Sequence, residues 1–304
     1  MSDSVAVSVV IPAFRGVRTI ANCLESVARA VGSRAHEIIV VESSHDGTAE
    51  LVRRRFPSVR LIQTEGRLTA GGARNRGAAT ARGCLVFFVD QDCTVPIDWI
   101  DRLEAHLQKP DVHAAGGSVG IQNPSNLSGA AVYFLEFLYH FPRGGPPRMD
   151  NFLVGCNSAY RREVLNAVRF PDVTLGEDVL FTQAVRDRGF GVLYDPTVEV
   201  RHQNREGWGE FFQYNRKMGE SSAAYHHVLQ RWWIQPFMRV PILTFLAPII
   251  ILPLIARDLA RSRWWYLLQF LLLSPMCLLG NLVWAGAFRR RALHFRAQAG
   301  RLAD

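Results

Sequence analysis

The most informative feature of this 304-residue chain is Leu85–Cys93, which reads L-V-F-F-V-D-Q-D-C. It opens with five apolar residues without polar alternation, which is typical of a strand buried on both faces of a parallel sheet. Ligands bind at the carboxyl ends of such strands, and here the strand runs into Asp90 and Asp92. Two carboxylates on a rigid strand end can coordinate Mg²⁺ or Mn²⁺, which neutralises a diphosphate. An ordinary Asp-rich turn is the alternative, because D-x-D alone often occurs by chance.

The segments before this strand alternate between strand and helix patterns. Apolar runs predict strands over 5–11, 37–41 and 59–63, and helical spacing predicts helices over 18–31, 48–56 and 73–82. This alternation predicts right-handed crossovers and a parallel, doubly wound α/β sheet. Polar or turn-forming residues follow the strands at 12–14, 42–47, 66–75 and 90–92. They would line one edge of the sheet, which is the nucleotide-binding pattern of open α/β folds.

Six motifs carry a family resemblance. They are V-S-V-V-I-P-A-F near Ser8, I-I-V-V-E-S-S-H-D-G-T from Ile38, A-G-G-A-R-N-R-G from Ala70, V-D-Q-D from Val89, V-G-C-N-S-A-Y-R-R-E-V-L from Val154 and L-G-E-D-V-L from Leu175. In this order they resemble the family-2 glycosyltransferases of the GT-A fold, over about residues 5–224. The resemblance implies a Rossmann-like, mostly parallel sheet with flanking helices. It also implies an enzyme that moves a sugar from a nucleoside-diphosphate sugar to an acceptor, with inversion.

The resemblance further implies roles for individual residues. Those expected to bind the nucleotide sugar are Pro12, Ala13, Glu42, Arg74, Asp90, Gln91, Asn157 and Glu177. Asp92 is expected to bind the metal, and Asp178 of the E-D pair is expected to be the general base. One departure concerns the donor, because Glu42-Ser43-Ser44 stands where the family usually carries two Asp and a Gly. This departure bears on which base the donor nucleotide has.

The chemistry asks for the same residue types independently of the family. Displacement at an anomeric carbon needs a proton acceptor beside the acceptor substrate and charge neutralisation beside the diphosphate. Gly176 allows a tight turn that would present Glu177 and Asp178 to a cleft. A helix N-cap is the alternative role for Asp178, and both roles can hold together. The first turn of a helix lowers the pKa of an acid, which partial burial would offset.

Two predicted site residues keep open roles. His202 follows a strand pattern at 198–201 and could bind the metal or contact the diphosphate, although nine histidines make a chance placement easy. Asn157 could shape a sugar pocket or could be a buried amide that satisfies backbone groups in a turn. The stretch from Gln213 to Lys217 resembles the Q-x-x-R-W element of processive polysaccharide synthases, with Lys217 in place of Trp. That mismatch argues against a processive polymerase.

Two apolar segments near the C-terminus predict membrane attachment. Residues 240–256 and 264–288 carry no charge, and the second is long enough to span a bilayer while the first is at the lower limit. We therefore expect a catalytic domain over 1–228 and a membrane-attached helical module over 229–304. A two-span hairpin is slightly favoured over a re-entrant or interfacial first segment. The prolines of the first segment and the arginines after it support the re-entrant or interfacial arrangement. A buried helical hairpin of a soluble domain is a third possible arrangement.

Charge and cysteine content bear on location and partners. The formal net charge is +8, and residues 257–304 hold eight Arg against two Asp, a net +6 beside the apolar segments. This placement favours an anionic membrane surface and not nucleic acid as the partner. Five cysteines without C-x-x-C spacing predict reduced thiols in a cytosolic domain. The polar N-terminus without a signal-peptide pattern agrees with catalysis at the cytoplasmic face of the cell membrane.

Together these features predict an inverting glycosyltransferase that depends on Mn²⁺ or Mg²⁺ and acts on a lipid or lipid-linked glycan acceptor. A non-catalytic, nucleotide-sugar-binding membrane subunit is an alternative from a different functional class. A metal-dependent nucleotidyltransferase is the alternative among enzymes, because it also needs strand-end acids and a metal. Only Lys109 and Lys217 are present as lysines for phosphate capture, which weakens that alternative.

Overall fold

The computed structural model describes residues 6–150 and 152–301, which divide into two compact units. The first unit comprises the chain up to Gly120 together with Pro142–Gln203, and the second comprises Ile121–Phe141 together with the chain from Asn204 onward. Helix α8 (Trp208–Leu229) belongs to the second unit. The boundary at 228–229 drawn from the sequence therefore falls at the end of α8, and the division of function at that point stays a prediction.

The first unit is built on a mixed sheet. Within the described residues the sheet has nine strands in the order β3-β2-β1-β4-β8-β6-β9-β5, with β7 paired to β9. The strands are β1 (Val7–Ala13), β2 (His36–Glu42), β3 (Arg60–Gln63), β4 (Leu85–Phe88), β5 (Cys93–Thr94), β6 (Ala114–Ile121), β7 (Arg148–Met149), β8 (Ser158–Arg161) and β9 (Val192–His202). The predicted parallel arrangement holds for β3, β2, β1 and β4, whereas β8 is antiparallel to β4 and β5 is antiparallel to β9. The predicted α/β class is confirmed.

Helices cover this sheet as the apolar strands require. They are α1 (Ile20–Val31), α2 (Thr48–Arg55), α3 (Ala70–Thr80), α4 (Trp99–Leu107), α6 (Arg162–Ala167) and α7 (Glu177–Asp187). Val9, Val40 and Phe87 in the parallel strands are fully buried, as expected for a sheet without a solvent face. Gly77 lets α3 approach β1, since a Cβ there would lie 2.3 Å from the Val10 Cγ1 atom. The close approach fixes α3 over the strands that carry the site.

Element boundaries differ from the sequence predictions in two informative places. Strand β4 ends at Phe88, because the chain turns after Asp90 and pairs Cys93 with His202 of β9. Helix α3 begins at Ala70 and not at Ala73, because the Thr69 side chain accepts a hydrogen bond from the Gly72 N–H. The sequence did not predict this earlier start, because Gly71 and Gly72 follow Ala70 and glycine is unfavourable inside helices. Val5, the predicted first residue of the first strand, lies outside the described residues.

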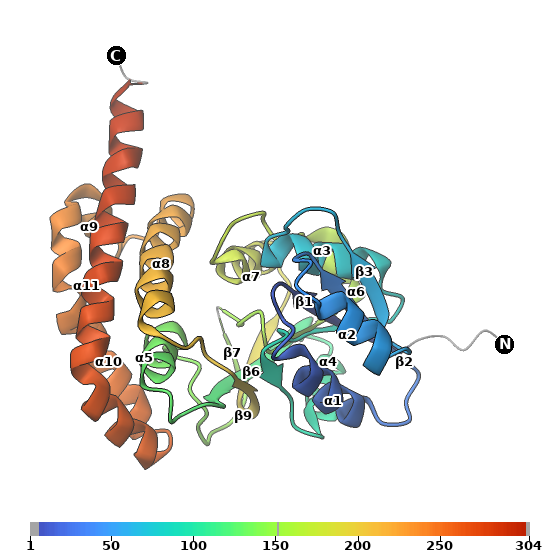
Figure 1. The fold of residues 1–304 in the computed structure, drawn as a ribbon. Coiled ribbons are helices and arrows are strands. Elements are labelled where there is room, and N and C mark those ends of the chain that lie inside the picture. The colour runs from blue at the N-terminus through green and yellow to red at the C-terminus, as the bar shows by residue number, and fades with distance from the viewer. Residues whose placement is uncertain (1–5, 151, 302–304) are drawn as a thin grey trace. The chain divides into compact units, whose positions relative to one another are not determined.

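The second unit is helical. It contains α5 (Leu127–Glu136), α8, α9 (Gln235–Arg239), the 3₁₀ helix η1 (Pro241–Leu246), α10 (Ala247–Ala260) and α11 (Trp264–Arg301). In Figure 1, α11 is the long red helix, with α5 and α8 on one side of it. Both predicted apolar segments are helical, and residues 241–260 and 264–298 are long and apolar enough to cross a membrane. A third or less of the most apolar window in each is buried within the protein.

Candidate active site

The carboxyl ends of β1, β2 and β4 bring several predicted site residues to one edge of the sheet. Pro12 and Ala13 end β1 in register with Val41 and Glu42 of β2. Gln91, which follows β4, forms two hydrogen bonds with the loop that follows β1. Its Oε1 atom accepts a hydrogen bond from the Phe14 N–H at 3.0 Å, and its Nε2 atom donates to the Phe14 carbonyl at 2.8 Å. Gln91 therefore holds two strand-end loops together, and its contact with a nucleotide sugar stays a prediction.

Arg74 of α3 joins the D-x-D segment to the E-D pair. Its Nη2 atom lies 2.7 Å from Asp90 Oδ1, and its Nη1 atom lies 2.6 Å from Glu177 Oε1. The guanidinium is only 2% exposed, and the neighbouring carboxylates raise its pKa, so it stays charged. With both terminal nitrogens engaged by carboxylates, Arg74 positions the acids. Its contact with the nucleotide, which the resemblance implies, stays a prediction.

Gly155 is a site residue to which the sequence analysis gave no role. A Cβ at this position would lie 2.6 Å from the Arg74 Nη2 atom, so only glycine leaves room for the guanidinium. The Gly155 N–H also donates to Asp178 Oδ2 at 3.2 Å. The V-G-C-N motif contains this glycine, but sequence alone could not show that it packs against a buried arginine 81 positions earlier.

Asp178 lies in the first turn of α7, after Gly176 with φ 83°. The helix cap is Gly176, so the N-cap alternative for Asp178 is wrong by two positions. Desolvation by burial raises the pKa of the Asp178 carboxyl to about 7, and Glu177 adds to the rise. Arg74 and hydrogen bonds from the backbone N–H groups of Gly155 and Val179 oppose it. A carboxyl that ionises near neutral pH is suited to accept a proton from a substrate hydroxyl.

Asp92 and His202 form the one cluster among the described residues with donor atoms spaced for a metal ion. The Asp92, Cys93 and His202 donor atoms lie within 4.8 Å of one another, and His202 Nε2 is 3.5 Å from Asp92 Oδ1. The pairing of β5 with β9 creates this cluster, and the predicted position of His202 at a strand end is confirmed. Burial raises the pKa of the Cys93 thiol, and sulfur is a poor match for Mg²⁺ and Mn²⁺, which prefer oxygen ligands. The remaining carboxylate and imidazole fit Mn²⁺, and Mg²⁺ through the carboxylate.

Glu42 ends β2 and is fully buried. Its Oε1 atom accepts hydrogen bonds from the N–H and the hydroxyl of Ser44, and its Oε2 atom has no partner among the described residues. Ser44 in turn receives the Arg15 N–H at 2.8 Å. The loops after β1 and β2 are therefore tied together at the predicted nucleotide edge. An unpaired buried carboxylate oxygen is unusual in a finished network and suits a site that a ligand completes.

Asn157 has the structural role that the sequence left open. Its Oδ1 atom accepts a hydrogen bond from the Trp99 indole at 2.9 Å, and its Nδ2 atom donates to the carbonyls of Ser118 and Val198. The side chain is fully buried. These contacts favour the buried-amide alternative over a sugar contact, because the amide already has partners on both ends.

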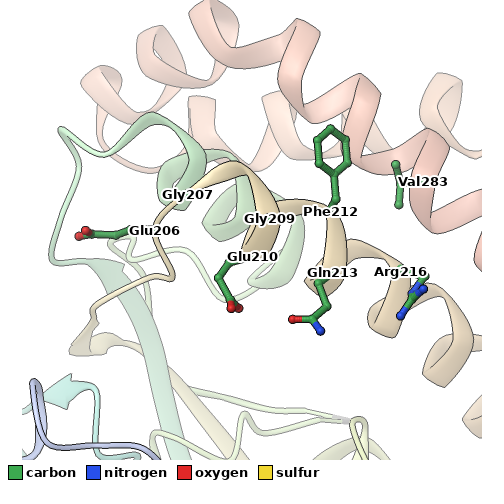
Figure 2. Close-up of a pocket in the computed structure, with 8 residues that line it drawn as sticks. All are labelled: Glu206, Gly207, Gly209, Glu210, Phe212, Gln213, Arg216 and Val283. Atoms are coloured by element: carbon green, nitrogen blue, oxygen red, sulfur yellow. The ribbon is translucent and has the colours of Figure 1, made fainter.

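The second unit has a concavity of its own of about 750 Å³. Its lining residues are Glu206, Gly207, Gly209, Glu210, Phe212, Gln213, Arg216 and Val283. Figure 2 shows the side chains of Glu210 and Gln213 on one side of α8, with Phe212 on the opposite side beside Val283 of α11. Gln213 and Arg216 are the two residues of the Q-x-x-R resemblance. This α8 pocket offers a carboxylate, an amide and a guanidinium next to an apolar wall.

Comparison with known proteins identifies the class to which this fold and site belong. The family model for glycosyl transferase family 2 matches residues 8–169, which is more than half of the chain. The chain therefore belongs to glycosyl transferase family 2, and the resemblance seen in the sequence is confirmed. This family match favours sugar transfer over the nucleotidyltransferase alternative.

Individual relatives agree. The chain is 25% identical over 221 residues to the glycosyltransferase AglE of Haloferax volcanii, a match that covers 70% of this chain and 72% of AglE. Its fold is similar to that of S. aureus TarS 1–349, solved in complex with UDP-GlcNAc, with a TM-score of 0.54 and 17% identity over 96% of this chain and 92% of that one. It is also similar to GalNAc-T7, solved with UDP, GalNAc and Mn²⁺, with a TM-score of 0.52 and 15% identity over 73% of this chain and 51% of that one. The protein is a glycosyltransferase with a GT-A fold.

Proposed function

We propose that this glycosyltransferase carries out a metal-dependent, inverting transfer from a nucleoside-diphosphate sugar to a lipid or lipid-linked acceptor at the cytoplasmic face of a membrane. One observation supports the catalytic part above all. The Arg74 bridge connects the D-x-D segment to the turn that presents Asp178, so a base and a charge-neutralising cluster belong to one connected site. An inverting displacement needs these two parts.

In the proposed reaction, Asp178 accepts the proton of the acceptor hydroxyl. The acceptor oxygen forms a bond to the anomeric carbon, and the bond from that carbon to the diphosphate oxygen breaks, so a single displacement inverts the centre. Asp92 and His202 would hold the divalent cation, which when bound neutralises charge on the leaving diphosphate. A phosphate acceptor at neutral pH would need less help from the base, since most of its protons are already lost.

Donor recognition is proposed for the edge formed by Pro12, Ala13 and Glu42. An N–H group of the base would hydrogen-bond to the unpartnered Glu42 Oε2 atom. Arg74, Asp90, Gln91 and Glu177 are proposed to contact the nucleotide sugar as well. UDP in the TarS and GalNAc-T7 structures makes a uridine donor the first to test. Glu42→Gln keeps the size of the side chain and replaces a carboxylate, which only accepts hydrogen bonds, with an amide, which both donates and accepts them. It should raise the donor KM and change the preference between uridine and guanosine donors.

The α8 pocket is proposed to bind the head group of a lipid. Arg216 and Gln213 offer charge and hydrogen bonds to a phosphate or sugar head group, and Phe212 and Val283 offer an apolar wall for the adjoining chain. Catalysis is assigned to residues 1–228 and membrane attachment to residues 229–304. The apolar helices α10 and α11 support membrane attachment.

The test is release of nucleoside diphosphate by the detergent-solubilised protein with UDP-, GDP- and dTDP-sugars, with lipid extract, and with Mn²⁺, Mg²⁺ or chelator. Release that needs both a donor and a metal supports the proposal, and NMR of the product anomeric centre decides between inversion and retention. Donor binding without turnover in any acceptor mixture would instead support the non-catalytic subunit.

A further inference from the structure

The second unit exposes an apolar stripe that runs along α10 and α11. We call this stripe the leucine face and define it by six side chains. They are Ile249 (71% exposed), Ile250 (52%), Leu268 (51%), Leu271 (53%), Leu272 (81%) and Leu282 (39%). A soluble protein rarely exposes so large a continuous apolar surface, and such a surface normally meets a membrane or a partner.

The opposite face of α11 is fixed to the rest of the unit along most of its length. Near its start, the Tyr266 hydroxyl receives the Ile121 N–H at 3.1 Å, and Gln269 donates to the Pro124 carbonyl at 2.5 Å. Further along, the Trp284 indole donates to the Ser222 hydroxyl at 3.2 Å. Past the apolar segment, the Phe295 ring stacks on His227 at 4.3 Å between centroids. The loop before α5 and the whole of α8 therefore run beside α11.

These neighbouring elements carry polar side chains at the level of the apolar segment. Gly280 and Val283 of α11 lie beside the first turns of α8, where Glu210, Gln213 and Arg216 are exposed. Asn123 and Glu206 bond to each other in the same part of the unit. The apolar residues 264–288 would extend for about 38 Å at 1.5 Å per residue, which exceeds a hydrocarbon core of about 30 Å.

An α11 that crossed the bilayer would take these polar neighbours into the hydrocarbon. Charged groups and unpaired polar groups are costly to place in the hydrocarbon, because no water is there to solvate them. An α11 that lies in the membrane plane avoids this cost. Its leucine face then enters the acyl boundary while α8 stays in water, which is the behaviour of an interfacial helix with one apolar face.

The arginines agree with the in-plane arrangement. Arg257, Arg261 and Arg263 mark the turn between α10 and α11, and a second group, Arg289, Arg290 and Arg291, follows the apolar segment. A spanning hairpin would put these two groups on opposite sides of the membrane, against the positive-inside rule. In the plane, both groups meet the head groups of one leaflet, where each is attracted to anionic lipid.

We propose that α10 and α11 seat the protein in one leaflet of an anionic membrane through the leucine face, without crossing it. The proposal rests on the membrane attachment in the proposed function and replaces the two-span hairpin that the sequence slightly favoured. It commits to a lipid surface as the occupant of the leucine face, because the flanking arginines complement anionic head groups and the stripe is apolar throughout.

The test is the sidedness of the α10–α11 turn in membranes of an expressing cell. Cys84 is the one exposed cysteine among the described residues and reports on the first unit. The other reporter is Ser262→Cys in a Cys84→Ser background. An impermeant maleimide should label both proteins in inverted membrane vesicles and neither in intact cells, with detergent giving the full signal. Labelling of Ser262→Cys from the outside, or from neither side, would overturn the proposal.

A second measurement separates seating from activity altogether. The variant with Ile249→Asn and Leu272→Asn should lose at least severalfold in flotation with vesicles of anionic and zwitterionic phospholipid. Ile97→Asn, an equally exposed position in the first unit at 73%, should float as the unchanged protein does. Unchanged flotation of the double variant, with an unchanged melting temperature in detergent, would overturn the proposal. Neither assay uses a donor, so a failed sugar-transfer assay does not affect it.

Discussion

The two units of this glycosyltransferase differ in where they place charged and apolar side chains. The first unit buries an ionic cluster, with Arg74 only 2% exposed and Glu177 only 7% exposed, while its sheet hides its apolar residues. The second unit exposes Leu272 at 81% and Trp264 at 73%. Burial of charge is costly unless partners and a function compensate for it, and exposure of leucine is costly in water. The contrast indicates that the first unit keeps charged groups buried for a functional site. It also indicates that the exposed apolar side chains of the second unit meet an apolar environment.

The largest expected effect comes from breaking the buried ionic cluster. Arg74→Met should destabilise the protein by about 3–5 kcal/mol, because it leaves Asp90 and Glu177 without their counter-ion. Chemical unfolding in detergent measures this loss. Arg76→Met, two positions along the same helix and exposed, is the control and should change stability by no more than about 0.5 kcal/mol. Equal effects from the two variants would mean that the Arg74 bridge is not a stabilising element.

Two adjacent leucines of α11 test which side chains of the second unit pack against protein. Leu273 is 6% exposed and Leu272 is 81% exposed, although both belong to α11. Leu273→Ala should cost about 2–5 kcal/mol of stability because it leaves a cavity. Leu272→Ala should cost no more than about 0.5 kcal/mol in detergent. Similar costs, read from unfolding midpoints, would show that the leucine face packs against protein.

A smaller effect is expected at the metal cluster. Asp92→Asn removes a charged ligand, so the Mn²⁺ concentration for half-maximal activity should rise by about tenfold or more, since even outer-shell partners commonly cost 10–100-fold. A metal titration of nucleoside diphosphate release measures the change. Asp98→Asn is exposed and is the matched control. Coincident titration curves for the two variants would rule out Asp92 as a ligand.

The acid limb of the pH profile tests the Asp178 carboxyl. Its pKa of about 7 means that kcat/KM should be full above pH 7 and should fall about tenfold per unit well below it, as the base becomes protonated. Because the folded pKa lies above the unfolded value of about 3.9, this group stabilises the fold fully below pH 4. That contribution is lost as pH rises through 7. A profile that stays flat down to pH 5 would contradict the assignment.

Much of this site can be predicted from the sequence, because the carboxyl ends of parallel strands lie at the same edge of a sheet. Asp92 and Glu42 are found where the alternation of strands and helices put them, and His202 is found at a strand end. The partners could not be predicted, because they come from distant parts of the chain. Arg74 reaches Glu177 across 103 positions, a pairing that no local pattern in the sequence indicates. The Asn157 amide likewise forms hydrogen bonds with distant residues, namely Trp99, Ser118 and Val198.

The membrane segments show the same limit. Hydropathy predicts apolar helices over the observed α10 and α11, but it counts residues along the chain and takes no account of neighbours. The packing of α8 on α11 is a tertiary fact, seen in contacts such as Trp284 with Ser222. In our proposal, the polar groups of α8 decide whether α11 crosses the bilayer or lies in its plane. A hydropathy average over the residues of α11 does not include these groups.

The most direct test of the central claim is nucleoside diphosphate release by Asp178→Asn beside the unchanged protein and Asp187→Asn, an exposed acid on the same helix. Asp178→Asn should lose about 10²–10⁴-fold in kcat, as expected for a general base, while its donor affinity is unchanged. Asp187→Asn should keep the unchanged rate. A folded Asp178→Asn protein that releases nucleoside diphosphate at the unchanged rate would contradict the assignment of the base and with it the proposed inverting mechanism.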